Sequence, residues 1–236
     1  MNILVTGASK GIGRAIAQKL ATVGNIFVTA RNEEALKKLD FISGYCVCDL
    51  AKEDDLTRLG NFIEETKIDV LVNNAGEYIY SPLADTKLDD LSHIIKVNLK
   101  APIYLASCAV KNMKQNHFGR IINIGSISGV MGEANACFYS ATKAGLVGFS
   151  KATGLELAEF GITVNTINPG WVDTELGKAS IEDGEFTQEE ILECIPQRRF
   201  VSPDEVASLV KYLITADAKG ITGQSINLCA GLSVGI

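Results

Sequence analysis

The chain has 236 residues, of which 47% are hydrophobic and 21% are charged, a composition typical of a globular protein rather than a disordered one. Its formal net charge is -6 and it has no long run of Lys and Arg, which argues against nucleic acid as the main partner. No stretch approaches the roughly 18 apolar residues of a membrane span, and the first residues do not resemble a signal peptide. We therefore expect a cytoplasmic protein that does not enter a membrane.

The cysteines show no Cys-x-x-Cys pair and no Cys/His cluster with the spacing of a zinc site. We therefore expect free thiols in a reducing compartment, and no metal site. The six cysteines are Cys46, Cys48, Cys108, Cys137, Cys194 and Cys229.

The predicted elements alternate between strand and helix along the chain. Residues 2–6 form a short apolar run that ends at glycines, which predicts a buried strand. Residues 12–23 carry apolar side chains at helical spacing, with Gly24 as the expected stop, and residues 25–30 predict a second strand. The next predicted elements are a strand at 43–48, a helix at 52–66, a strand at 69–73, a helix at 88–115, a strand at 120–125, a helix at 138–160 and a strand at 162–167.

The last part of the chain begins with residues 169–198, which lack strand character and are irregular and acidic. Ser202 as cap, Pro203 at the first helical position and Glu205 three residues after the cap predict the start of a helix. Residues 224–228 predict a final strand. No linker or change of composition divides the chain, so we expect one domain over residues 1–236.

Strands separated by single helices predict right-handed crossovers, and hence an α/β fold with a doubly wound parallel sheet. We expect about seven strands with helices on both faces. Such a sheet binds its ligand outside the carboxyl ends of its strands. The unusual residues of this sequence follow those ends.

A glycine-rich turn, Thr6-Gly7-Ala8-Ser9-Lys10-Gly11-Ile12-Gly13, joins the first predicted strand to the first helix. Glycines in this place let phosphate oxygens approach a helix N-terminus, where unpaired N–H groups and the helix dipole favour an anion. The spacing differs from the Gly-x-Gly-x-x-Gly dinucleotide fingerprint, and three glycines after a strand can also form a plain turn. At the first strand–helix junction of an alternating chain, we interpret them as a nucleotide site.

Five motifs together resemble the short-chain dehydrogenase/reductase family from end to end of the chain. They are the glycine turn, Asn73-Asn74-Ala75-Gly76, Ser126, Tyr139-Ser140-Ala141-Thr142-Lys143, and Asn168-Pro169-Gly170 with Thr174. The resemblance implies a Rossmann fold and a nicotinamide cofactor bound at the carboxyl edge of the sheet.

The chemistry near the second strand favours NADP(H). An acid at the end of that strand would select NAD, but Ala30-Arg31 stands there, and Lys10 lies in the glycine turn. Two cations would favour a 2′-phosphate, although both could also be solvated surface charges. The resemblance adds Asp49 for the adenine amino group and Leu50 for packing against the ring. The predicted cofactor residues are Gly7, Ser9, Lys10, Gly11, Ile12, Gly13, Arg31, Asp49, Leu50, Asn74, Ala75, Gly76, Tyr139, Lys143, Pro169, Gly170, Val172 and Thr174.

The predicted catalytic group is Asn98, Ser126, Tyr139 and Lys143. Tyr139 and Lys143 lie four residues apart on a predicted helix and so share a face. A nearby ammonium lowers the pKa of a tyrosine hydroxyl, and a serine hydroxyl can polarise a carbonyl. The resemblance implies that Asn98 supports a water that relays protons to the lysine. Taken singly, each has a plainer explanation: a solvated pair, a turn serine, a local hydrogen bond.

The substrate is less defined by the sequence. We expect the loop at 169–198 to close over it, with residues 77–80 and 130–133 as further walls, and Trp171 either as a wall or as a core residue. Within that family, the sequence most resembles the 3-oxoacyl-acyl-carrier-protein reductases. At positions where those enzymes carry docking arginines, this chain has His117 and Phe160, beside a retained Arg120. Carrier-protein docking is therefore in doubt, and a free ketone, a coenzyme A ester or a polyketide stays open.

We therefore expect an NADPH-dependent reductase of a 3-oxoacyl-type thioester or related ketone. The alternatives are an NAD(P)-dependent dehydrogenase of a small free alcohol or ketone, and a nucleotide sensor without turnover. A sensor would be expected to lose the Tyr/Lys pair, which is intact here. The resemblance further implies a homotetramer, and the long predicted helices 88–115 and 138–160 would be hard to cover within one subunit.

Overall fold

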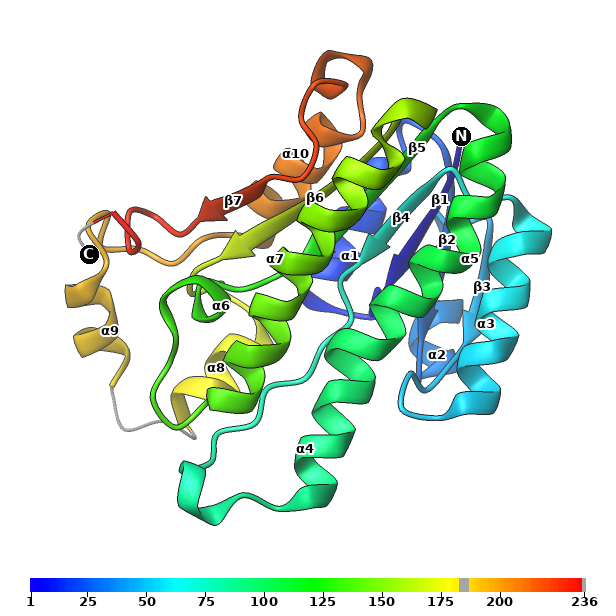
Figure 1. Ribbon diagram of the computed structural model, residues 1–236. Coiled ribbons are helices and arrows are strands. Elements are labelled where there is room, and N and C mark those ends of the chain that lie inside the picture. Colours follow the sequence, from blue (N-terminus) through cyan, green and yellow to red (C-terminus); the bar gives the residue numbers. More distant parts are fainter. Residues whose placement is uncertain (183–186, 235–236) are drawn as a thin grey trace.

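The computed structural model describes residues 1–182 and 187–234, and within them seven strands form one parallel sheet (Figure 1). The spatial order is β3-β2-β1-β4-β5-β6-β7, which confirms the predicted doubly wound sheet. The strands are β1 (Asn2–Thr6), β2 (Asn25–Ala30), β3 (Gly44–Val47), β4 (Val70–Asn73), β5 (Gly119–Ile124), β6 (Ile162–Pro169) and β7 (Ser225–Leu228).

Helices connect these strands and cover both faces of the sheet (Figure 1). The α-helices are α1 (Gly11–Leu20), α2 (Glu33–Lys37), α3 (Glu53–Thr66), α4 (Leu88–Ile95), α5 (Ala101–Asn116), α6 (Ser128–Met131), α7 (Cys137–Leu157), α8 (Glu175–Glu182), α9 (Gln188–Cys194) and α10 (Pro203–Leu213). A π-helical turn spans Lys96–Lys100, and short 3-10 turns span Leu83–Asp85, Ala158–Phe160 and Ala216–Ala218.

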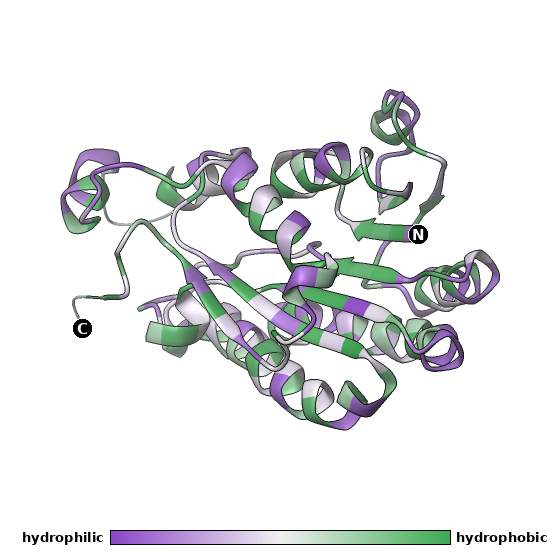
Figure 2. Cartoon of the chain, turned by 90° about the horizontal axis from the view of Figure 1, so that it is seen from above, coloured by the Kyte–Doolittle hydropathy of each residue, from purple (hydrophilic) through white to green (hydrophobic). Residues whose placement is uncertain are grey.

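Two apolar cores, one on each face, hold the layers together. On one face α1, α2 and α10 pack against the sheet, and on the other α3, α5 and the end of α7 do so. Strands β1 and β4 are nearly continuous apolar runs because both of their faces are covered, whereas β6 also buries Thr and Asn side chains; Figure 2 shows both green and paler or purple segments along the strands. Strand β1 pairs with β2 on one side and with β4 on the other, so the strand order reverses beside it. The carboxyl end of β1 is therefore the expected ligand position.

The first helix ends earlier than predicted. It stops at Leu20 rather than at residue 23, and its C-cap is Ala21 rather than Gly24. Gly24 serves a different purpose, since a Cβ there would lie 2.6 Å from the Met1 carbonyl oxygen. Glycine is needed here because the chain before β2 passes close to the backbone of Met1, and helical periodicity does not reveal this contact.

The predicted helix at 88–115 is interrupted by the π-helical turn, which joins α4 to α5. A π-helical turn contains about one more residue than an α-helical turn. The region 169–198 is less irregular than predicted, because it contains α8 and α9. Helix α9 starts with a capping box between Thr187 and Glu190, a signal the sequence does carry. The predicted Ser202 cap of α10 is confirmed, with Glu205 completing its capping box. The short helices α2 and α6 were not predicted.

Candidate active site

The carboxyl ends of the central strands open into a cleft of about 1540 Å³. Every predicted cofactor residue lines this cleft, and so does Ser126. Asn98 does not, because it is fully buried behind the cleft wall. Residues far apart in the sequence therefore meet at the edge of the sheet where strand order reverses.

The glycine turn between β1 and α1 is fixed by its contacts with the end of β4. The Thr6 hydroxyl accepts hydrogen bonds from the backbone N–H groups of Asn74 and Ala75, at 3.0 and 2.9 Å. The Asn74 side-chain amide donates to the Thr6 carbonyl at 2.8 Å. A Cβ on Gly13 would collide with the Gly7 carbonyl oxygen and the Asn74 amide, and Gly7 has a φ of +66°. The turn therefore needs glycine here, and it leaves the start of α1 facing the cleft.

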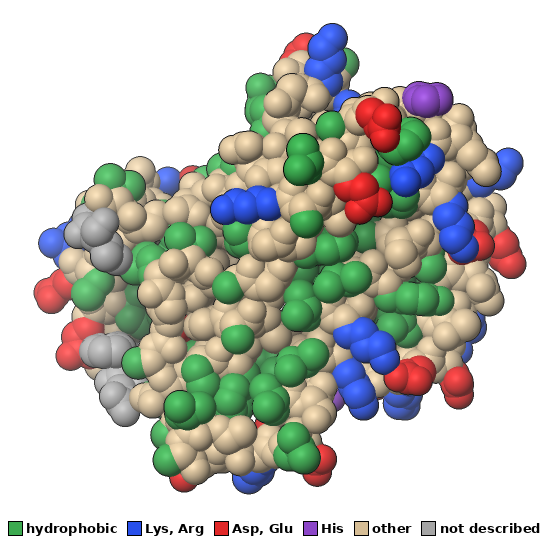
Figure 3. All heavy atoms as spheres, in the orientation of Figure 1, with side chains coloured by type: hydrophobic (Ala, Val, Ile, Leu, Met, Phe, Trp, Pro, Cys, Tyr) green, Lys and Arg blue, Asp and Glu red, His purple; other side chains and the backbone are tan. Residues whose placement is uncertain are grey.

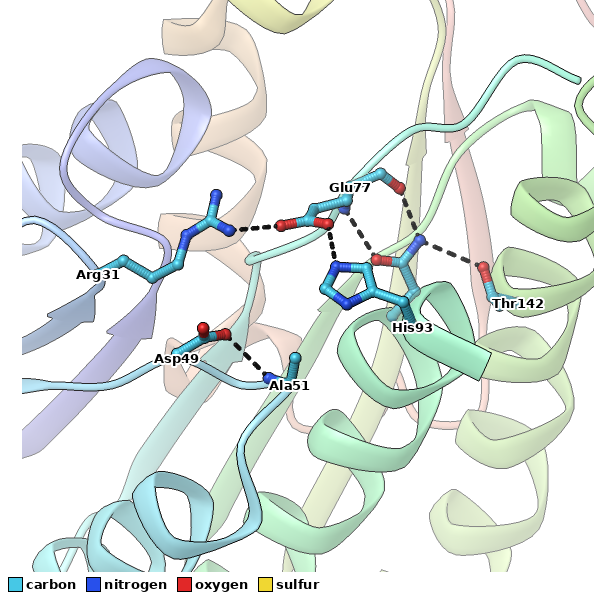
Figure 4. Close-up of polar contacts among 7 residues, drawn as sticks. Arg31, Asp49, Ala51, Glu77, His93 and Thr142 are labelled. Atoms are coloured by element: carbon cyan, nitrogen blue, oxygen red, sulfur yellow. Dashed lines mark hydrogen bonds and ion pairs between the residues drawn. The ribbon is translucent and has the colours of Figure 1, made fainter. Parts of the chain in front are cut away.

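Polar side chains surround the glycine turn where β2 and β3 end. Asp49 follows β3 and accepts a hydrogen bond from the backbone N–H of Ala51 at 3.1 Å, while Leu50 is buried. Arg31 follows β2 and reaches Glu77, which follows β4, with its guanidinium 2.9 Å from the carboxylate (Figure 4). Lys10 forms a 2.6 Å ion pair with Glu175 at the start of α8. Both predicted cations are therefore paired with a carboxylate, although their side chains remain largely exposed.

Tyr139 and Lys143 lie on α7 with their side chains in the cleft. Lys143 is 4% exposed, and its Nζ donates to the Ile124 carbonyl at 2.9 Å. Burial lowers the pKa of Lys143 to about 8. Its Nζ lies 5.5 Å from the centre of the Tyr139 ring.

The pKa of Tyr139 differs from the sequence-based expectation. Burial raises this pKa to about 12, a hydrogen bond with Ser126 acts in the opposite direction, and the charge of Glu133 raises it further. Lys143 is not among the causes of this pKa shift; its ammonium donates to the Ile124 carbonyl and lies 5.5 Å from the centre of the Tyr139 ring. A spacing of four residues places two side chains on one helix face but does not bring their polar ends together.

Asn98 lies in the π-helical turn and binds the backbone of Glu77 with both ends of its amide. Its Oδ1 accepts from the Glu77 N–H at 2.9 Å, and its Nδ2 donates to the Glu77 carbonyl at 2.8 Å (Figure 4). A Cβ on Gly76 would lie 3.3 Å from Lys143 Nζ and 3.4 Å from Asn98 Oδ1. Asn98 is therefore close to Lys143 and also fixes the chain that follows β4.

The end of β6 supplies the last predicted cofactor residues. The Gly170 N–H donates to the Leu228 carbonyl at 3.0 Å, and Val172 is buried and bridges to Val201. Thr174 contacts the glycine turn, since a Cβ on Gly11 would lie 3.5 Å from its Cγ2. These contacts bring the start of the 169–198 region next to the turn after β1.

A hydroxyl–carboxylate network lies on the other side of Tyr139. The Ser126 hydroxyl donates to Ser128 at 3.1 Å, and Ser128 donates to Glu133 at 2.6 Å. The Tyr78 hydroxyl donates to the second Glu133 oxygen at 2.8 Å, and its ring packs edge-on against Tyr139 with centres 5.1 Å apart. Sequence reasoning missed Ser128; its alternation with Ser126 after a strand was the available signal.

The predicted substrate walls are present in part. Glu77, Tyr78, Met131, Gly132 and Glu133 line the cleft, as do side chains of α8 and α9. Trp171 combines its two alternatives, because it lines the cleft and also packs against the core, with its ring centre 6.3 Å from that of Phe200. Residues 183–186 of the predicted loop lie outside the described residues.

Across residues 1–182 and 187–234, no group of three or more His, Cys, Asp or Glu side chains is placed to hold a metal ion. Over the same residues, no helix has the length and apolar character needed to cross a membrane. Each of the six cysteines is a free thiol.

Comparison with known proteins adds three findings. A family model described as Enoyl-(Acyl carrier protein) reductase matches residues 7–233. The 3-oxoacyl-(acyl-carrier-protein) reductase FabG of Rickettsia felis is 38% identical over 97% of this chain and 95% of its own, and the reductase MabA of Mycobacterium bovis is 36% identical over 99% and 93%. An actinorhodin polyketide ketoreductase variant solved with NADPH superposes with a TM-score of 0.92 at 37% identity, covering 98% of this chain and 96% of its own.

A second solved structure extends this comparison. YwfH, an NADPH-dependent reductase involved in bacilysin biosynthesis, superposes with a TM-score of 0.93 at 31% identity, covering 100% of this chain and 99% of its own.

Proposed function

The chain belongs to the short-chain dehydrogenase/reductase family as an NADP-dependent oxidoreductase, and we propose that it reduces the carbonyl of a 3-oxoacyl-type thioester to a hydroxyl. One observation carries this proposal: the side chains of Ser126, Tyr139 and the buried Lys143 come together in a single cleft. That cleft adjoins a glycine turn suited to phosphates.

The residues present fit a dinucleotide that carries a 2′-phosphate. The turn from Gly7 to Gly13 presents the start of α1 to the cleft, and Asp49 and Leu50 are placed for an adenine. Lys10 and Arg31 supply positive charge beside the end of β2, where the adenosine ribose binds in this fold. These residues would hold NADPH, which would supply the hydride for the carbonyl carbon.

Ser126 and Tyr139 act on the carbonyl oxygen. The Ser126 hydroxyl, which donates to Ser128 in this structure, would turn to donate its proton to that oxygen and stabilise the negative charge that develops on it. Tyr139 gives its hydroxyl proton to the same oxygen. Burial keeps the pKa of Tyr139 near 12, so the hydroxyl is protonated at neutral pH and acts as an acid, which suits reduction of a carbonyl.

Lys143 and Asn98 support this pair. With a pKa lowered to about 8 by burial, Lys143 is mainly charged at neutral pH, yet it can release a proton at little cost. Lys143 would be the source from which Tyr139 regains its proton through intervening hydroxyl groups, because no direct Tyr139–Lys143 hydrogen bond is present, and its ammonium would hold the ribose hydroxyls of the cofactor. Asn98 fixes the backbone of Glu77 beside them, and its role in a water relay remains a prediction.

A thioester of a 3-oxo acid is the first candidate substrate because the relatives FabG and MabA are named as 3-oxoacyl reductases. The substrate half of the cleft combines apolar side chains such as Met131 and Trp171 with carboxylates such as Glu133 and Glu193. A neutral acyl chain fits such a surface, whereas a free carboxylate would be repelled.

One observation favours a substrate that is not delivered by a carrier protein. Arg120, the one retained docking position, is buried, and its guanidinium donates to the carbonyls of Gly119 and Gly161. Its charge is therefore directed inward rather than toward a docking partner. Lys114 over the Phe160 ring is a cation on that surface, at 4.6 Å. A coenzyme A ester or a free ketone is therefore the second candidate.

The test is NADPH oxidation followed at 340 nm with matched substrates. Acetoacetyl groups carried on acyl carrier protein and on coenzyme A would be compared with a simple cyclic ketone. Turnover of the thioesters with at least about tenfold higher kcat/KM than the ketone supports the proposal. Preference for the free ketone, or binding of NADPH without turnover of any carbonyl, contradicts it, and the second result would support a nucleotide sensor.

We also propose that the chain forms a homotetramer. Large apolar side chains remain exposed on α4, α5 and α7, including Leu88, Ile95, Ile103 and Leu155, and Figure 3 shows green side chains gathered on the face that these helices form. Sedimentation at micromolar concentration should therefore show a species larger than 25.3 kDa. The cytoplasmic location and the single-domain organisation also stay predictions.

A further inference from the structure

Both cations that flank the glycine turn are already paired with a carboxylate. Lys10 is bound to Glu175 at 2.6 Å, and Arg31 is bound to Glu77 at 2.9 Å. All four side chains line the same cleft. An entering 2′-phosphate must therefore exchange places with a carboxylate or share a cation with it.

The two carboxylates differ in how firmly they are held. Glu175 is 75% exposed on the first turn of α8, so its side chain can turn into solvent when Lys10 finds another anion. Glu77 is 28% exposed, and its backbone N–H and carbonyl are both bound by the Asn98 side chain, at 2.9 and 2.8 Å. Its second carboxylate oxygen lies 2.6 Å from Nε2 of His93 (Figure 4). The backbone of Glu77 is therefore fixed beside the cleft, and His93 gives its carboxylate a second partner there.

Glu77 consequently remains near any anion that Arg31 binds. Two like charges a few ångströms apart repel each other, and water at a half-exposed site reduces this repulsion without removing it. His93 lies on the side of the carboxylate away from Arg31 and offers it an alternative partner (Figure 4). A small rotation of the Glu77 side chain toward His93 would release Arg31.

We propose that Glu77 is a specificity-determining residue that competes with the 2′-phosphate for Arg31, and that His93 limits this competition by holding the carboxylate. The cofactor site then depends on five charged or polar side chains, Lys10, Glu175, Arg31, Glu77 and His93, rather than on a pair of cations. This inference goes beyond the proposed carbonyl reduction, since it concerns how strongly the chain distinguishes NADP from NAD.

The test is calorimetric titration of the cofactor-free protein with adenosine 2′,5′-bisphosphate, and with adenosine 5′-monophosphate as the matched ligand without the 2′-phosphate. Glu77→Gln keeps the backbone contacts with Asn98 and removes the charge. We expect this variant to bind the bisphosphate about threefold to tenfold more tightly, with affinity for the monophosphate nearly unchanged. The gain should shrink as salt is raised, because screening weakens repulsion between exposed charges.

Two further variants sharpen the result. Glu175→Gln is the matched control on the other cation, and its gain should be smaller than that of Glu77→Gln, because Glu175 can already move into solvent. His93→Phe leaves Glu77 with Arg31 as its partner and should weaken bisphosphate binding. Unchanged or weaker bisphosphate binding by Glu77→Gln, with the thermal midpoint retained, would overturn the proposal, since Glu77 would then merely position Arg31.

Discussion

The two halves of the cleft are built in different ways. The half beside β1 and β4 depends on backbone: Gly13 packs against Gly7, and the Thr6 hydroxyl accepts from two N–H groups in the segment that follows β4. The half beside α8 and α9 depends on side chains such as Met131, Trp171 and Glu133. Side chains can be exchanged without altering the chain path, whereas the glycine turn cannot. The same fold can therefore keep one cofactor while it changes substrates.

Replacement of Tyr139 by Phe should give the largest effect that separates the two halves of the cleft. It removes the proposed proton donor and leaves the cofactor half intact. The change removes one hydroxyl and keeps the ring that packs against Tyr78. We expect turnover to fall by at least about a hundredfold, the lower end of general acid contributions, while NADPH affinity is retained. Stopped-flow turnover and fluorescence titration of NADPH would measure the two effects. Near wild-type turnover, with chemistry shown to be rate-limiting, would mean that another group is the acid.

Lys143 belongs to both halves, so its removal should affect both. Lys143→Ala should lower turnover and weaken NADPH binding together, which Tyr139→Phe should not do. A KM and dissociation constant for NADPH equal to those of the wild type would show that the ammonium does not hold the ribose.

Although replacement of Lys143 should impair function, we expect it to increase the stability of the fold. Lys143→Met, a replacement of similar length, tests this. The folded-state pKa of Lys143 is lowered to about 8 from 10.5, so burial of the charge costs stability at any pH where the unfolded lysine is charged. The cost is fully present below pH 8 and disappears as pH rises through 10.5. Denaturant unfolding at pH 7 should show the variant about 1–3 kcal/mol more stable, a gain reduced by the Ile124 carbonyl that loses its donor. A less stable variant would mean that the ammonium is well compensated.

Arg31→Asp tests the cofactor half alone. The change replaces the proposed partner of the 2′-phosphate with a like charge, and should weaken NADPH binding by roughly 1.5–3 kcal/mol, the range for hydrogen bonds to charged groups. NADH binding should change far less, so the ratio of the two dissociation constants is the measurement. If the wild type already binds NADH as tightly as NADPH, the role given to Lys10 and Arg31 is wrong.

The parts of the site that depend on residues close together in the chain could be predicted from the sequence. The glycine turn and the Tyr139/Lys143 pair depend on residues close in the chain, and the alternation of elements fixes the edge of the sheet on which they lie. The π-helical turn at Asn98 could not be predicted, since one extra residue leaves the apolar pattern nearly unchanged. The Arg31–Glu77 pair joins residues after different strands, so it depends on side-chain directions that periodicity does not contain.

The substrate half offers the smallest predicted effect, at Glu133. Its carboxylate accepts from Ser128 and Tyr78, and a Gln side chain would keep an acceptor for one of them while removing the charge. Glu133→Gln should raise kcat/KM for a free 3-oxo acid by about twofold to fivefold relative to its neutral ester, because a like-charge repulsion of partly exposed groups is lost. NADPH affinity should not change. Glu65→Gln, on the exposed side of α3, is the matched control and should alter neither ratio. Equal effects on acid and ester would show that Glu133 acts through Ser128 and Ser126 rather than through its charge.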